Sequence, residues 1–208
     1  MKKLMVFLCA MVLLFVGAVG IEATPMPLVE WNDPTTDYLE SGDFTVGFAF
    51  TTDIVQNVVA LGVYDRGIGF GGVSRSVSIW EDNTQLLLAT TTVSDNDAVN
   101  PLEGHFRYQD IAPVTLEVGK TYVVGANSSN DYIAYNNSLI KAAGINFSED
   151  RFASGSAFPD ISIGFEGWFG ANAKAVAPVP EPATMLLLGT GLIGLTGFGR
   201  KKLFKKKG

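Results

Sequence analysis

Two uncharged apolar runs, one near each end, limit the part of this 208-residue chain that can fold in water. Near the C-terminus, residues 183–199 carry no charge, and six basic residues follow them: Arg200, Lys201, Lys202, Lys205, Lys206 and Lys207. A helix over this run would be roughly 25 Å long, close to the thickness of a bilayer core. Because basic flanks stay on the cytoplasmic side, we expect one transmembrane helix over 183–199 and a cytoplasmic tail over 200–208.

Residues 1–23 have the pattern of a secretory signal peptide, with Lys2 and Lys3, then an apolar stretch, then small residues. We expect signal peptidase to cut after Gly20, with Ala23 as the alternative. Cys9 is the only cysteine and lies in this segment. The mature protein therefore has no disulfide and no His/Cys zinc site, and a hydrophobic core must stabilise it.

A short linker over 178–182 precedes the C-terminal apolar run and contains Pro180, Glu181 and Pro182. Proline fixes its own φ and holds the preceding residue extended, the form in which proteases and transpeptidases bind peptides. The residues alone leave two interpretations open. The segment is either a processing signal or a plain membrane anchor with a proline linker.

Val179-Pro180-Glu181-Pro182, the short glycine-rich span and the terminal Arg-Lys-Lys cluster together resemble the PEP-CTERM sorting signal of Gram-negative bacteria. The resemblance covers residues 179–208. It implies that exosortase, a membrane-embedded transpeptidase-like enzyme, recognises Pro180, Glu181 and Pro182. It also implies a precursor anchored in the inner membrane, a later place at the cell surface or in the extracellular matrix, and a setting rich in exopolysaccharide.

The middle of the chain, residues 24–177, is strongly acidic. Eight of the 15 basic residues and two of the 21 acidic residues lie outside it, which leaves seven against nineteen and a net charge of −12. Such a domain repels nucleic acid, so we expect no nucleic-acid partner.

This middle part shows no long helical periodicity. It contains short runs rich in Val, Ile, Thr and aromatic residues, separated by Gly, Asn and Asp. We expect strands over 44–51, 57–64, 73–80, 86–93, 105–111, 114–118, 121–126, 132–135 and 161–165, with a helical turn at 137–143. Strands at this spacing favour an all-β fold, an antiparallel β-sandwich of the jelly-roll type.

A second resemblance covers residues 44–126. Ser78-Ile79-Trp80, Leu87-Leu88-Ala89-Thr90, Phe106-Arg107-Tyr108 and the stretch 113–126 follow one another as in an uncharacterised exported β-sandwich module often found beside PEP-CTERM tails. This resemblance implies the fold and brings no known active site.

Two sets of residues are candidates for ligand binding. Exposed aromatic rings stack on sugars, and the candidates are Trp31, Tyr64, Trp80, Tyr132, Tyr135 and Trp168. Oxygen ligands on loops bind calcium, and the candidates are Asp95, Asp97, Asn100 and Asp131, the last with Asn127 or Asn130. The alternatives are ordinary packing for the rings and turn capping for the Asp and Asn side chains.

Catalytic chemistry has little support in the sequence. His105 is the only histidine, and its place in a strand is typical of a half-exposed sheet residue. Four acids, Asp65, Asp82, Glu103 and Asp110, lie near strand ends and suggest paired carboxylates, but a surface this acidic supplies such pairs by chance. We therefore expect no catalytic residues, no cofactor, with structural calcium as the alternative, and a non-enzymatic structural protein. The alternatives are a carbohydrate-binding module and a polysaccharide hydrolase.

Overall fold

The fold is described by a computed structural model, which covers residues 24–33, 35–136, 138–164 and 167–177. The predicted signal peptide, the transmembrane helix over 183–199 and the basic tail lie outside these residues. Among the described residues, no helix has the length and apolar character needed to cross a membrane.

The described chain is built of antiparallel strands, which confirms the all-β prediction. Its strands are β1 (Met26–Pro27), β2 (Val29–Glu30), β3 (Thr36–Leu39), β4 (Phe44–Thr52), β5 (Gln56–Tyr64), β6 (Ser74–Glu81), β7 (Leu86–Ser94), β8 (Leu102–Glu103), β9 (Phe106–Leu116), β10 (Thr121–Asn127), β11 (Tyr132–Tyr135), β12 (Ile140–Lys141), β13 (Ile145–Ser154), β14 (Ile161–Ser162), β15 (Trp168–Phe169) and β16 (Ala171–Val176).

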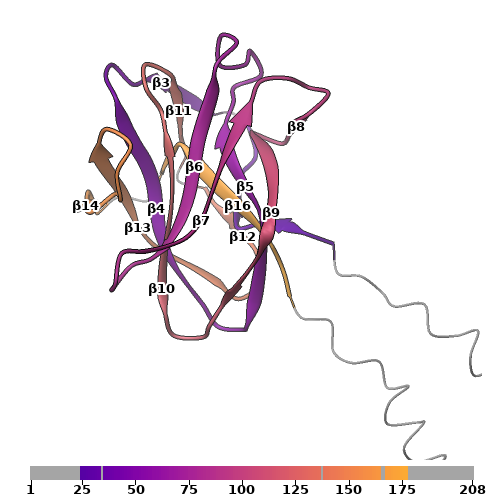
Figure 1. Ribbon diagram of the computed structural model, residues 1–208, viewed down its shortest axis with the longest axis vertical. Coiled ribbons are helices and arrows are strands. Elements are labelled where there is room, and N and C mark those ends of the chain that lie inside the picture. The colour runs from indigo at the N-terminus through magenta and orange to yellow at the C-terminus, as the bar shows by residue number, and fades with distance from the viewer. Residues whose placement is uncertain (1–23, 34, 137, 165–166, 178–208) are drawn as a thin grey trace, which may run out of the picture. The chain divides into compact units, whose positions relative to one another are not determined.

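Two large sheets form the layers of the fold. One has the order β14-β13-β4-β10-β6-β7 and the other the order β1-β16-β5-β9-β8. Figure 1 shows β4, β6 and β10 on the left of the domain and β5, β9 and β16 to their right. Smaller sheets, β15-β11-β3 and β12-β2, complete the domain. This order does not confirm the predicted jelly roll. The sequence shows how strands are spaced along the chain, but that spacing does not fix which strands pair.

The core lies between the two large sheets and follows the period of two that a strand imposes on its side chains. Val46, Phe48 and Phe50 of β4 point inward, as do Val77 and Ile79 of β6, and all are buried. The alternation seen in the sequence therefore fixed the inward faces of both strands.

Several predicted elements differ from the structure. The helical turn predicted at 137–143 is wrong, because Ile140–Lys141 is extended and pairs with β2. The strands β13 and β16 were missed, since their sequences mix polar and small residues with few large apolar ones. The two strands predicted over 105–118 are the single strand β9. Its register against β5 shifts between Val58 and Ala60, and Pro113 lies in the stretch of β9 that faces this bulge.

Burial in this core predicts that two matched Leu→Ala substitutions lower the free energy of unfolding by unequal amounts. Leu61→Ala removes a fully buried side chain from β5 and should lower the free energy of unfolding by about 2–5 kcal/mol. Leu86→Ala, at a leucine that is 56% exposed on β7, should change it by less than about 0.5 kcal/mol. Urea unfolding of both variants measures the difference, and equal losses would contradict this placement of the core.

Candidate functional site

The outer face of the six-stranded sheet carries a row of small polar side chains. Ser76, Ser78 and Trp80 of β6 point away from the core, because Val77 and Ile79 between them point into it. On the neighbouring strand β10, Gly125 lies opposite Ser78. On β7, Thr90 lies opposite Ser78 from the other side.

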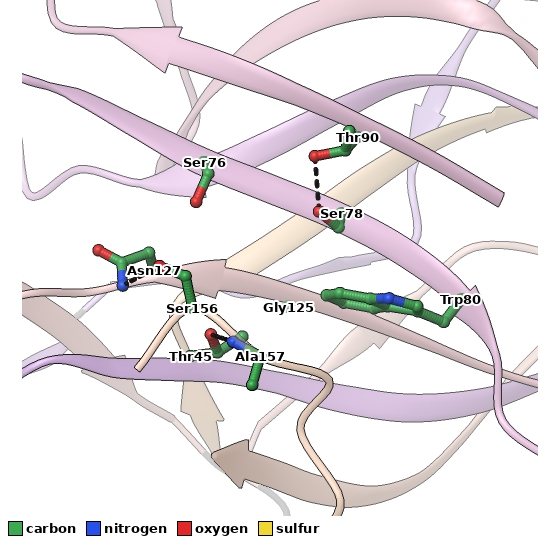
Figure 2. Close-up of a pocket in the computed structure, with 9 residues that line it drawn as sticks. All are labelled: Thr45, Ser76, Ser78, Trp80, Thr90, Gly125, Asn127, Ser156 and Ala157. Carbon is green, nitrogen blue, oxygen red and sulfur yellow. Dashed lines mark hydrogen bonds between the residues drawn. The ribbon is translucent and has the colours of Figure 1, made fainter. Parts of the chain in front are cut away.

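A shallow groove of about 210 Å³ lies over this row. Figure 2 shows the groove between strands β6 and β10 and the segment that follows β13. Its lining residues are Thr45, Ser76, Ser78, Trp80, Thr90, Gly125, Asn127, Ser156 and Ala157. None of these side chains is charged.

Gly125 forms the floor of the groove, and a larger residue could not take its place freely. A Cβ atom there would lie 2.9 Å from Thr45 Cγ2, 3.2 Å from Pro159 Cγ and 3.4 Å from Trp80 Cζ3. The missing side chain gives the indole of Trp80 room to extend across the sheet toward this position (Figure 2).

The wall opposite β7 is the segment after β13, and hydrogen bonds fix it to the sheet. The hydroxyl of Thr45 donates to the carbonyl of Gly155 at 2.7 Å and accepts from the amide of Ala157 at 3.2 Å. Phe158 packs edge-on against Trp80, with ring centroids 5.7 Å apart. Trp80 is therefore half-buried and held in one orientation.

Two polar side chains of the groove already donate hydrogen bonds to other side chains of the protein. Ser78 donates to the hydroxyl of Thr90 at 2.8 Å. The Asn127 amide donates to the carboxylate of Asp43 at 2.5 Å and to Ser156 Oγ at 3.0 Å. Because a carboxylate only accepts, the Asp43 contact sets the orientation of the amide and leaves its oxygen as an acceptor.

The other aromatic candidates lie elsewhere. Trp31 and Tyr64 are only 2% and 3% exposed, so their prediction as sugar-stacking rings is wrong: they pack in the core with Phe106 and Phe169. Tyr132 is covered by the Arg66 guanidinium, 3.5 Å from its ring centroid. Tyr135 and Trp168 contact each other and Tyr38 in a separate cluster on the three-stranded sheet.

Three of the calcium candidates hold loops in place. The Asp95 carboxylate accepts hydrogen bonds from the amides of Gly72 and Phe70, which together hold its pKa below the usual value despite partial desolvation. Asp97 pairs with Arg107. The Asn100 side chain accepts from the amide of Ser94 and donates to the carbonyl of Tyr108. These contacts favour the turn-capping alternative.

The fourth calcium candidate, Asp131, pairs with Arg75 at 2.8 Å and accepts a hydrogen bond from the amide of Tyr132. Within the described ranges, no group of three or more His, Cys, Asp or Glu side chains is arranged to hold a metal ion. Calcium binding stays a prediction.

The glycine-rich segment 67–72 wraps around a buried carboxylate. Asp65 Oδ1 accepts hydrogen bonds from the amides of Gly67, Ile68 and Gly69 at 2.8–3.0 Å, and Asp65 Oδ2 pairs with Arg107 Nε at 2.5 Å. Gly67 and Gly69 have positive φ, which turns their amides toward the carboxylate. The segment is a loop between β5 and β6.

His105 is held between two carboxylates. Its Nδ1 lies 2.6 Å from Glu30 Oε1, its Nε2 lies 3.2 Å from Asp33 Oδ1, and its ring stacks on Trp31 at 4.8 Å. Burial lowers the pKa of His105, but the hydrogen bonds and charges of Glu30 and Asp33 outweigh burial and raise the pKa above 6.5. The cluster ties the segment after β2 to the start of β9.

Two of the remaining acids at strand ends also contact basic groups. Asp82 pairs with Arg151 at 3.3 Å, and Glu103 pairs with Lys174 at 2.6 Å. Asp110 lies on β9, opposite Ala60 of β5. The structure therefore brings Asp65, Asp82 and Glu103 to three different cations.

Comparison with known proteins identifies the C-terminal segment. A family model described as the PEP-CTERM protein-sorting motif matches residues 178–202, which include Pro180, Glu181 and Pro182. The chain therefore carries this sorting motif, as its sequence predicted, and the motif supports export through a membrane-anchored precursor with exosortase processing. No curated protein matches the chain.

Sequence reasoning found Trp80 but missed most of the groove. The alternation of Ser74, Ser76, Ser78 and Trp80 was visible, and it placed these residues on one face. Thr45, Gly125 and Ser156 come from β4, β10 and the segment after β13, and nothing in their local sequence indicates that they meet. Asn127 was considered as a calcium ligand and not as part of a groove with Trp80.

The ion pairs of Arg107 predict different effects for two Asp→Ala substitutions. Asp65→Ala removes a buried partner with three backbone contacts and should lower the free energy of unfolding by about 3 kcal/mol or more. Asp97→Ala removes an exposed partner of the same guanidinium and should cost less than about 1 kcal/mol. Urea unfolding provides both values, and a larger loss for Asp97→Ala would refute the structural role given to Asp65.

The His105 cluster predicts a pH-dependent contribution to stability. Because its folded-state pKa is raised, the contribution is complete below the ordinary histidine pKa and is lost as pH rises through the folded-state pKa. His105→Gln should therefore destabilise the protein more at about pH 5.5 than at about pH 9. Urea unfolding at both pH values measures the effect. A loss of unfolding free energy that grows with pH would contradict the prediction.

Proposed function

We propose that this chain is a non-catalytic structural protein of the cell surface or extracellular matrix, delivered by exosortase-dependent sorting in a Gram-negative bacterium. The observation that carries the proposal is the sorting motif at residues 178–202, which begins shortly after the last described strand ends at Val176. All described strands precede the motif. A cut at or near Pro180-Glu181-Pro182 would therefore leave the β-domain in one piece.

The contacts of the chemically active side chains support a non-catalytic role. Both ring nitrogens of His105 contact carboxylates. Asp65, Asp82 and Glu103 each pair with a different basic side chain. A polysaccharide hydrolase needs two carboxyl groups facing each other across a sugar, and these contacts do not favour that alternative. The structural role is associated with exopolysaccharide or biofilm through the setting that the motif implies.

A carbohydrate-binding module is the second candidate function. The groove beside Trp80 favours it, because an aromatic ring next to hydroxyl and amide groups suits the mixed apolar and polar surface of a sugar.

The sorting proposal predicts that Glu181→Ala blocks processing in the native host. The variant should accumulate as a membrane-bound precursor, because the acidic centre of the recognised segment is lost, whereas the wild-type domain leaves the membrane. Cell fractionation followed by mass spectrometry of the C-terminus measures both effects.

Glu117→Ala is the matched control, since it makes the same charge change on an exposed residue of the domain. It should be processed and delivered like the wild type. If Glu181→Ala were cut and located like this control, the segment would be a passive linker and the sorting proposal would fail.

A further inference from the structure

We propose that the groove on the outer face of the six-stranded sheet binds a neutral saccharide, with Trp80 stacking on one pyranose ring. The inference rests on the second candidate function and names its ligand class. It is independent of sorting, because every lining residue belongs to the described domain.

Trp80 supplies the apolar part of the site. The C–H face of a pyranose packs on an aromatic ring, and the gain is larger when the ring is already ordered. Phe158 and the close approach at Gly125 hold the indole in place before a ligand arrives. Figure 2 shows the indole lying along the groove beside Ser78 and Gly125.

Two polar side chains of the site, Ser78 and Asn127, present oxygen acceptors. Ser78 gives its proton to Thr90, so its remaining lone pairs are available to a ligand. Asn127 directs its amide protons toward Asp43 and Ser156, which leaves Oδ1 as an acceptor. Sugar hydroxyl groups are donors that satisfy such acceptors, whereas a carboxylate or sulfate offers only further acceptors.

Charge also selects against acidic sugars. The groove lining has no cation, and the carboxylate of Asp43 accepts a hydrogen bond from the amide of Asn127 in the lining. The domain around it carries a net charge of −12 from seven basic and nineteen acidic residues. An anionic polysaccharide would meet repulsion here without a compensating partner.

The size of the groove limits how much of the saccharide it holds. Its volume of about 210 Å³ is below the range of about 300–1,000 Å³ that is usual for pockets enclosing drug-sized ligands. Thr90, Ser156 and Ala157 on its rim are exposed, so the groove opens to solvent. This geometry suits one ring of a longer chain whose neighbours extend past the rim.

The test is calorimetric titration of the full-length chain in a detergent without a sugar headgroup. The probes are glucose-, galactose- and mannose-based hexasaccharides, with oligogalacturonate of the same length as the anionic probe. We expect at least one neutral probe to bind, and to bind at least tenfold more tightly than oligogalacturonate.

Variants of the groove locate the binding. Trp80→Ala should weaken binding of that neutral probe at least tenfold, and Ser78→Ala should weaken it about threefold to tenfold. Ser74→Ala is the matched control, because Ser74 lies on the same face of β6 but outside the lining. Its affinity should equal that of the wild type. If Trp80→Ala fails to fold, Ser78→Ala still decides the question.

Three results would overturn the inference: no binding of any neutral probe, tighter binding of oligogalacturonate, or wild-type affinity in both groove variants. Any of these results with normal delivery in the host would leave the sorting proposal intact. Conversely, a Glu181→Ala variant that is delivered normally would leave the groove proposal intact.

Discussion

The structure depends on the burial of strand β4 on both of its faces. Phe48 and Phe50 fill the core on one side and are fully buried. On the other side Thr45 and Ala49 are also buried, and the segment after β13 bonds to the Thr45 hydroxyl. A strand in the middle of a sheet that is covered twice cannot slip in register without exposing apolar groups.

This second covering layer also creates the groove. The segment that bonds to Thr45 reaches Trp80 of β6 through Phe158, and Gly125 lies between them with no side chain to fill the gap. The same packing therefore stabilises β4 and shapes the groove. The groove is shallow because it is the uncovered remainder of a sheet face.

The charged side chains of the domain mostly hold its loops and distant segments together. Arg107, Arg75 and Arg151 each reach carboxylates that come from distant parts of the chain, and Asp65 and Asp95 organise the glycine-rich segment 67–72 through backbone amides. The acidic composition suggested metal or catalytic chemistry, but many of these oxygens contact the protein's own donors. The groove is a part of the surface that this charge network leaves neutral.

The sequence by itself determined the sorting motif, the all-β class and the inward faces of β4 and β6. Each of these follows from residues that are neighbours in the sequence: a Pro-Glu-Pro linker before an apolar run, and a period of two in Phe44–Thr51 and Val73–Trp80. It did not determine the strand order, the strands β13 and β16, or the burial of Trp31 and Tyr64. Only the tertiary structure decided these, because pairing and covering depend on residues far apart in the chain. Thr45, Asn127 and Ala157 line one groove with Trp80 for that reason, and no local sequence pattern indicates that they do.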